Sequence, residues 1–372
     1  MVPLIFWGRL RITPSTLAAF AFVSWAAVSL LWSPDWKDGL DQLIKLGLML
    51  GLFLFVQSAE IKVWGYVVSA ALLGAIGLDY FMPMTHGAMG NQNFFAEFVI
   101  LCLPFTVMSR FTWPAGVAGI VYLFAFNDSN LRWLVVAAVA LWGLIWLARR
   151  KAYFSAMVAF LVPVDAALAW GVNVRDILYS ISSRAEIWIS SGALWLDHPV
   201  IGTGFGGFNF YHDAYREKFY GLFPNLLTAM GSPVMFAGEA HNEILQTLAE
   251  LGLVGLALAL AFLWFVWKER KSGYGVAVLA LGAVLSLIGF PAHNPGTAVI
   301  LVIALGMVCR GGKEVRLTKW RLLAVPSLAG GILFWLAHYF PGAQAYGVTY
   351  FILDRMNSVP RVVEYRFMYF NK

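Results

Sequence analysis

The segment from residue 240 to residue 252 carries the side chains best suited to chemistry. Asn242, Gln246 and Glu250 recur at every fourth position at the start of a strongly apolar run, so they share one face of a predicted helix. His241 stands at the mouth of that helix. Polar groups of this kind are costly in hydrocarbon unless a cavity solvates them or a reaction uses them. The cluster therefore indicates chemistry at a membrane surface.

Histidine is the side chain whose ordinary pKa lies nearest to neutrality, which suits a general base. We predict this role for His241, with Asn242, Gln246 and Glu250 as supporting residues that orient neighbouring loops or helices. The alternative interpretation is a helix cap combined with hydrogen bonds between helices.

Three arginines in expected external segments are candidates for binding a diphosphate. Arg132 follows an Asn-Asp-Ser-Asn-Leu segment at the end of an apolar run, and Arg184 begins an amphipathic stretch. A guanidinium group matches the geometry of phosphate oxygens through two parallel hydrogen bonds. Snorkelling to the membrane interface is the alternative for both residues. Arg216 is a weaker candidate, because a solvated surface helix explains it equally well.

Four further polar residues in or beside apolar runs have mainly structural interpretations. Asn91 and Asn93 lie in a turn before an apolar run, where their amides either line a cavity or cap the helix. Asp79 and Asp165 lie inside apolar runs, and we expect each to pair within a helix bundle.

Other common chemical motifs find no support in the sequence. The glycine-rich segment 202–208 lacks the strand–turn–helix context of a dinucleotide site, and we predict a flexible turn that dips to the membrane interface. Clusters of histidine and cysteine with metal-ligand spacing are missing from the sequence. We therefore expect no metal and no cofactor.

Composition fixes the class of protein. The 372 residues are 60% hydrophobic and 12% charged, whereas a soluble domain has about 25% charged residues. Together with a mean hydropathy of +0.73, these values predict an all-α polytopic membrane protein. The net charge of +6 is explained by cytoplasmic lysine and arginine, so no nucleic-acid partner is expected. Cys102 and Cys309 are not expected to form a disulfide.

Apolar runs predict about eleven transmembrane helices, of which the fourth and fifth are short. Residues 1–12 are too short to span and show no cleavage site typical of a signal peptide. The expected spans are 15–32, 41–57, 63–81, 94–108, 114–126, 131–148, 152–172, 243–267, 274–290, 296–309 and 322–340.

The placement of lysine and arginine at the span ends puts the N-terminus in the cytoplasm and one large loop outside, between spans seven and eight. Four regions follow from this topology. They are an N-terminal transmembrane bundle (1–172), a periplasmic loop with amphipathic helices (173–242), a C-terminal transmembrane bundle (243–340) and an external periplasmic tail (341–372).

Several motifs in residues 15–310 together resemble the O-antigen ligase and O-antigen polymerase superfamily of bacterial envelope glycosyltransferases. The most specific is the His-Asn-x-x-Leu-Gln segment that begins at His241. The others are Leu31-Trp32-Ser33-Pro34-Asp35, Gly90-Asn91-Gln92-Asn93-Phe94-Phe95-Ala96, Ser183-Arg184, and Asp197-His198-Pro199-Val200-Ile201-Gly202-Thr203-Gly204.

The resemblance implies a GT-C-type enzyme of the bacterial inner membrane whose active site faces the periplasm. Such an enzyme moves a glycan from undecaprenyl diphosphate to an acceptor hydroxyl with inversion and without nucleotide or metal. The family's catalytic histidine would correspond to His241, and its two diphosphate-binding arginines to Arg132 and Arg184. The chemistry is coherent, because arginine stabilises a departing diphosphate and histidine accepts a proton from an alcohol.

The sequence does not identify the acceptor. Ligation to lipid A-core is the leading hypothesis, and polymerisation of glycan repeats or transfer to protein uses the same donor chemistry. A transporter of lipid-linked glycans is the hypothesis from a different class. Broken helices and an inverted internal repeat would favour transport, and the sequence contains no convincing repeat.

Overall fold

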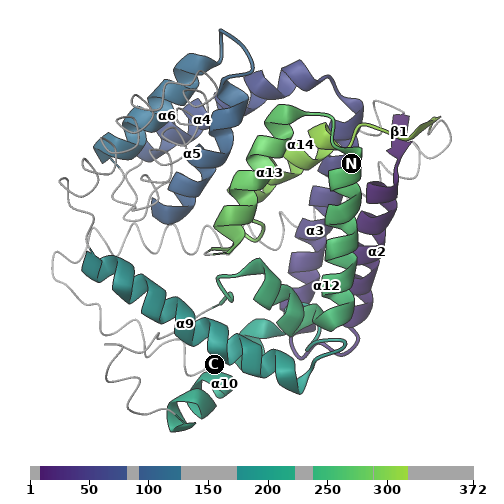
Figure 1. Cartoon of the computed structure of the whole chain (residues 1–372), viewed down its shortest axis with the longest axis vertical. Coiled ribbons are helices and arrows are strands. Elements are labelled where there is room, and N and C mark those ends of the chain that lie inside the picture. The colour runs from purple at the N-terminus through teal and green to yellow at the C-terminus, as the bar shows by residue number, and fades with distance from the viewer. Residues whose placement is uncertain (1–8, 82–91, 127–173, 223–237, 288, 317–372) are drawn as a thin grey trace, which may run out of the picture. The chain divides into compact units, whose positions relative to one another are not determined.

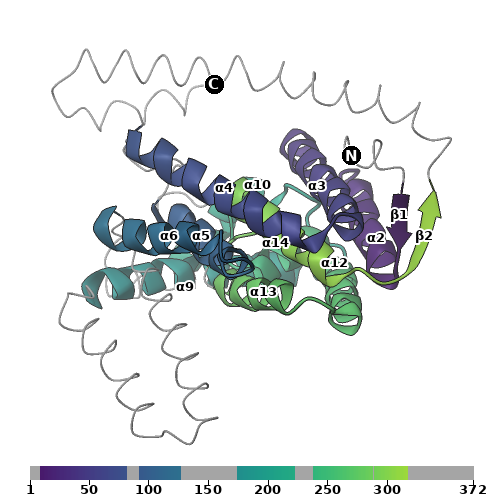
Figure 2. The same ribbon diagram turned by 90° about the horizontal axis from the view of Figure 1, so that it is seen from above.

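The computed structural model describes residues 9–81, 92–126, 174–222, 238–287 and 289–316. These residues form helices and one pair of short strands (Figures 1 and 2). In chain order the elements are β1 (Arg9–Ile12), α2 (Pro14–Ser29), α3 (Trp36–Ser58), α4 (Ile61–Phe81), α5 (Gln92–Thr106), α6 (Trp113–Phe126), α9 (Val174–Asp197), α10 (Phe208–Leu222), α12 (Glu243–Glu269), α13 (Gly273–Ser286), α14 (Pro295–Val308) and β2 (Lys313–Arg316).

Local sequence explains where many of these helices begin. A short polar side chain at the N-cap accepts hydrogen bonds from backbone N–H groups of the first turn, which have no partner inside the helix. Proline at the first helical position reinforces α2 and α14, since its ring fixes a helical φ and it needs no hydrogen-bond acceptor. The caps are Thr13 for α2, Asp35 for α3, Asn242 for α12, Ser272 for α13 and Asn294 for α14.

Eight of the eleven expected spans coincide with described helices, namely α2 to α6 and α12 to α14. Three helices, α3, α4 and α12, are long and apolar enough to cross a membrane, and the other five are shorter apolar helices. The expected spans 131–148, 152–172 and 322–340 and the tail 341–372 lie outside the described residues. The chain is therefore a helical membrane protein, and the count of eleven and the sidedness stay predictions.

The all-α fold that the sequence predicts also contains one pair of short strands. β1 and β2 pair in antiparallel register, with Arg9 opposite Arg316 and Ile12 opposite Lys313 (Figure 2). Each strand has four residues, which is too short for a recognisable alternation of polar and apolar residues. The pairing joins the two ends of the described region, so local sequence does not reveal it.

Two hydrophobic cores hold most of the described helices together, and a third, small cluster joins α2 to α12 through Ala26 and Leu251. The larger core lies among α3, α4, α5, α6, α13 and α14 and includes Leu72, Phe95 and Met307. The smaller core joins α9, α10 and the start of α12 through Leu194, Phe208 and Ala249. Helix α12 also packs along α2, and α3 packs along α14 (Figure 1). The smaller core therefore attaches α9 and α10 to the start of α12.

The glycine-rich segment after α9 is buried, not a flexible turn at the interface as the sequence suggested. All residues from 202 to 208 are buried. The backbone N–H of Thr203 donates to the carbonyl of Ala249, and that of Gly204 donates to the carbonyl of Glu250. Both hydrogen bonds have a length of 2.9 Å. These bonds supply the hydrogen-bond partners that a buried loop needs.

Helix α12 is broken where this segment meets it. Gly252 has a φ of 65° inside α12, a conformation that side chains other than glycine rarely adopt. The break frees the N–H groups of Leu253 and Val254, which donate to the carbonyls of Pro199 and Val200 at 2.9 and 3.1 Å. A Cβ atom on Gly252 would stand 2.3 Å from the Val200 carbonyl oxygen. Only glycine fits at this position.

Gly252→Ala should therefore destabilise the protein. The positive φ alone costs roughly 1–3 kcal/mol for a residue other than glycine, and the clash with backbone atoms adds to it. We expect a clearly lower midpoint of thermal unfolding in detergent. Gly47→Ala in α3 is the matched control, because a Cβ there meets nothing within 4 Å. Equal midpoints for the two variants would contradict the assigned break.

Candidate active site

His241 lies just before the N-cap of α12 and contacts two other parts of the chain. Its carbonyl accepts a hydrogen bond from Trp188 Nε1 in α9 at 3.4 Å. Its ring packs edge-on against Phe290 in the segment before α14, with 4.7 Å between ring centroids. Within the described ranges His241 is the one residue other than glycine with a positive φ, at 50°. Unusual backbone conformations of this kind concentrate at functional sites.

Arg184 in α9 acts electrostatically on His241. The pKa of His241 is lowered to about 4, first by burial and then by the positive charge of Arg184. Burial also lowers the pKa of Arg184, while the charge of Glu97 in α5 opposes that shift. The fold thus brings together the predicted base and one predicted diphosphate ligand. At neutral pH His241 is uncharged, and its ring nitrogen is able to accept a proton.

Asn242 does not share the helix face of Gln246 and Glu250, as the four-residue spacing suggested. It lies outside the helix as the N-cap. Its Oδ1 accepts from the backbone N–H groups of Ile244 and Leu245 at 3.0 and 3.1 Å, and its Nδ2 donates to the Leu287 carbonyl at 3.4 Å. These bonds fix the residue that follows His241.

Gln246 and Glu250 fix the other side of His241. Gln246 Oε1 accepts from the Ala240 backbone N–H at 2.6 Å, and Gln246 Nε2 donates to Glu250 Oε1 at 3.0 Å. Glu250 Oε1 also accepts from the Phe208 backbone N–H at 3.4 Å. Both side chains are almost fully buried. This chain of hydrogen bonds connects the buried glycine-rich segment to the backbone beside His241.

The remaining predicted site residues are only partly placed. Arg132 and Asn91 lie outside the described residues. Asn93 lies in the first turn of α5 with an exposed side chain. Arg216 lies on α10 and forms an ion pair with Asp213 at 3.3 Å. The proposed role of Arg216 in diphosphate binding stays a prediction.

Glu97 belongs to the surroundings of Arg184 and His241. It is buried in α5, and its charge acts on Arg184. A Cβ on Gly289 would lie 2.8 Å from Glu97 Oε1. Glu97 therefore connects α5 to the segment that carries Phe290.

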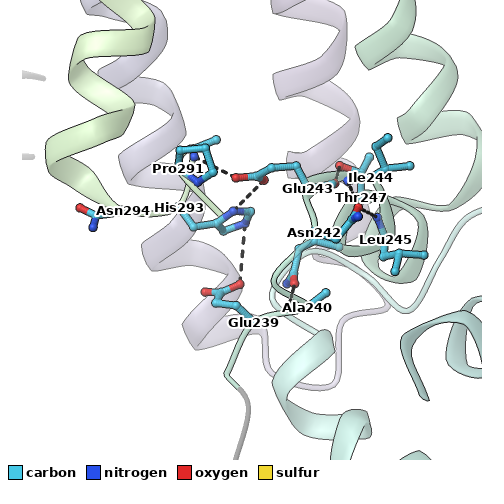
Figure 3. A network of polar contacts seen from close by, with 12 residues as sticks. Glu239, Ala240, Asn242, Glu243, Ile244, Leu245, Thr247, Pro291, His293 and Asn294 are labelled. Atoms are coloured by element: carbon cyan, nitrogen blue, oxygen red, sulfur yellow. Dashed lines mark hydrogen bonds and ion pairs between the residues drawn. The ribbon is translucent and has the colours of Figure 1, made fainter. Parts of the chain in front are cut away.

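His293 is the residue that the sequence analysis missed. Its Nδ1 lies 3.0 Å from Glu243 Oε2, and its Nε2 lies 3.9 Å from Glu239 Oε2 (Figure 3). Glu243 Oε1 accepts from the Ala292 backbone N–H at 2.8 Å. Burial lowers the pKa of His293, but the interactions with Glu243 and Glu239 and the charge of Glu250 outweigh it and raise the pKa to about 10.

The two histidines therefore carry different charges at neutral pH. His293 is protonated and ties the 290–294 segment to the start of α12, while His241 is neutral. The signal that pointed to His241 was also present for His293, since both are polar residues next to apolar runs. Among the residues that the structure describes, no group of three histidine, cysteine or acidic side chains is arranged to hold a metal ion.

Comparison with known proteins identifies a family. A family model described as O-antigen ligase matches residues 95–260. The matched range begins in α5 and ends in α12, so it contains Glu97, Arg184 and His241. A search of curated proteins found no match.

Proposed function

We propose that this chain, which residues 95–260 place in the O-antigen ligase and polymerase superfamily, transfers a glycan from undecaprenyl diphosphate to an acceptor hydroxyl. The family match and the apolar helices support a membrane glycosyltransferase that acts on a lipid-linked glycan and an acceptor. Our proposal adds the bacterial inner membrane, a periplasmic active site and the assignment of residues to steps.

The observation that carries the proposal is the position of His241 at the start of α12, where it packs against α9 through Trp188 and where burial and the charge of Arg184 lower its pKa. In the proposed step, His241 takes the proton of the acceptor hydroxyl while the oxygen attacks the anomeric carbon. The bond from that carbon to the diphosphate oxygen breaks, and the configuration inverts. Arg184 stabilises the charge that develops on the leaving diphosphate. A bound diphosphate also offsets the charge of Arg184, so we expect it to raise the pKa of His241 and make the ring a stronger base.

Ligation to lipid A-core is our leading assignment, in keeping with the description of the matching family. Polymerisation of glycan repeats and transfer to protein are alternatives with the same donor. Arg132 and Arg216 stay candidates for the second diphosphate ligand.

The break in helix α12 favours a transporter, because helices broken in the membrane are typical of transporters. Helix α12 is broken at Gly252. Here, however, the freed N–H groups of Leu253 and Val254 bond to residues 199 and 200 of the same chain. The break therefore serves the fold, and we keep the enzyme assignment.

A transfer assay tests the function. The purified full chain, given a lipid-linked glycan, rough lipopolysaccharide as acceptor and excess chelator, should form product and release undecaprenyl diphosphate. Neither nucleotide nor membrane gradient should be needed, because the donor bond supplies the driving force. Activity that is lost with chelator and restored by a divalent ion would overturn the metal-free mechanism. Lipid movement across vesicles without product for any acceptor would favour the transporter.

A further inference from the structure

Two neighbouring cavities lie beside the predicted active site. The first has a volume of about 340 Å³, and its lining at the starts of α3 and α12 combines charged and polar side chains with apolar ones. The second has a volume of about 230 Å³ and lies among α2, α3, α12 and α14. They share the lining residues Phe22, Leu46, Met49 and Ala292, so a polar chamber and an apolar groove adjoin one another.

The groove is suited to a lipid chain. All of its lining side chains are apolar, including Phe53 and Phe262. Along α12 the polar chamber is lined by residues up to Leu251, and the groove begins at Ala259, about two helical turns further on. Helices α3 and α12 are both long and apolar enough to span a membrane. The pair of cavities therefore has the polarity of an amphipathic lipid.

The chamber requires hydrogen-bond donors from whatever binds in it. Gln42 Nε2 donates to Asp38 Oδ2 at 2.9 Å, which leaves Gln42 Oε1 as an acceptor. Among the oxygens that line the chamber, Gln42 Oε1 and Glu239 Oε2 are buried without a hydrogen bond. The Nε2 atom of His293 lies 3.9 Å from Glu239 Oε2, which is an ion-pair distance and not that of a hydrogen bond. Buried polar atoms of this kind are uncommon and costly. Hydroxyl groups of a ligand would satisfy both oxygens.

Charge in the chamber argues against a phosphate. Four carboxyl groups line it, from Asp38, Glu239, Glu243 and Glu250. Lys45 and His293 also line it, but Lys45 pairs with Asp41 at 2.6 Å and His293 pairs with Glu243 at 3.0 Å. Figure 3 shows His293 enclosed between Glu239 and Glu243. A phosphate would meet carboxylates and lone-pair acceptors, whereas a sugar offers hydroxyl donors.

We infer that the chamber and the groove form one site for an amphipathic lipid with a hydroxyl-rich head, and that its occupant is the glycolipid acceptor. The identification of the occupant as the acceptor rests on the proposed function. Glu239 and Glu243 line the chamber and flank His241 in the sequence. The acceptor head and the base therefore use the same short segment, while Arg184 on α9 serves the donor diphosphate.

A pair of probes with identical tails tests the site. The full chain in phosphatidylcholine nanodiscs is titrated with decyl maltoside and with decyl phosphate, and binding is followed as the rise in the thermal unfolding midpoint. Decyl maltoside should bind at least about tenfold more tightly, because only its head supplies several hydroxyl donors. Gln42→Met should remove most of this preference, since it removes one acceptor oxygen.

The matched variants test the groove. Ala259→Trp fills the groove and should weaken decyl maltoside binding by at least about tenfold, the effect of excluding about two methylene groups from an apolar site. Leu260→Trp is the control, because Leu260 is 56% exposed on the outer face of the same helix. In the transfer assay Ala259→Trp should raise KM for the acceptor and leave donor affinity unchanged.

Equal binding of the two probes, or equal binding by the two tryptophan variants, would overturn the site. Loss of donor affinity in Ala259→Trp would overturn the assignment to the acceptor, since the groove would then hold the donor chain. Binding is measured without turnover. Selective maltoside binding by a protein inactive with every donor would therefore support the site while contradicting the proposed function.

Discussion

His241→Ala should lower the rate of glycan transfer by roughly 10²–10⁴-fold, the usual effect of removing a general base. The unfolding midpoint should change little, because the hydrogen bond from Trp188 goes to the backbone carbonyl of residue 241 and survives the substitution. Donor affinity should also be retained, since Arg184 is intact. The measurement is product formation from a purified lipid-linked donor under single-turnover conditions.

His198→Ala is the matched control. His198 precedes the buried glycine-rich segment, and its ring lies 5.9 Å from that of Tyr211, so its loss should leave the transfer rate close to wild type. Full activity in a folded His241→Ala variant would rule out the proposed base. A comparable loss in both variants would mean that the assay reports damage to the fold.

The pH dependence provides a second test of the same residue. Only neutral His241 is able to accept a proton, so activity should fall as the pH drops through its pKa. In kcat/KM, which reports the free enzyme, the acid limb should lie near the pKa of about 4. In kcat it should lie higher, because the bound diphosphate offsets the charge of Arg184. An acid limb that persists unchanged in the residual activity of His241→Ala would assign it to another group.

Much of the fold is predictable because its signals are local. A run of apolar residues long enough to span a membrane needs only its own composition, and the run expected at 243–267 matches α12 at Glu243–Glu269. Capping is equally local, since Asn294 and Pro295 begin α14 through their own side chains. The resemblance to the O-antigen ligase and polymerase superfamily, drawn from short motifs, is confirmed by the family match.

The buried glycine-rich segment was mispredicted because its structure depends on a distant partner. In isolation, Gly-Thr-Gly-Phe-Gly-Gly is typical of a flexible turn. In the fold its N–H groups bond to α12, and Thr203 contacts Ala249, 46 positions along the chain. Gly252, which makes room for this contact, looks like an ordinary small residue in an apolar helix. Neither the glycine-rich segment nor Gly252 indicates this contact when it is considered without the other.

Proximity within the site was predicted for one pair and missed for another. The expectation that Arg184 lies near His241 came from the resemblance, and the structure brings their charges into interaction. The ion pair of His293 with Glu243 joins residues fifty positions apart and belongs to no motif considered in the sequence. The charge of His293 follows from the nearby carboxylates, whose effect on its pKa outweighs that of burial and which composition does not reveal.

Arg184→Lys should reduce transfer by on the order of tenfold although it keeps the positive charge, because lysine cannot form two parallel hydrogen bonds to a diphosphate. Arg184→Ala should reduce it by about 10²–10³-fold, the usual effect of removing a group that stabilises developing negative charge. Both variants should bind undecaprenyl diphosphate more weakly than the wild type, and the alanine variant should bind it more weakly than the lysine variant. Arg270→Lys is the control, because Arg270 follows the far end of α12, where it stacks on Trp267.

The pKa of His241 distinguishes a diphosphate ligand from a residue that only supports the fold. The charge of Arg184 helps to lower that pKa, so the acid limb of kcat/KM should move to higher pH in Arg184→Ala and stay near its original position in Arg184→Lys. Added diphosphate should then raise the pKa of His241 in wild type and have little effect in Arg184→Ala. If donor affinity and the acid limb are unchanged in both variants, Arg184 is a structural residue of α9, and the diphosphate must be bound by other cations.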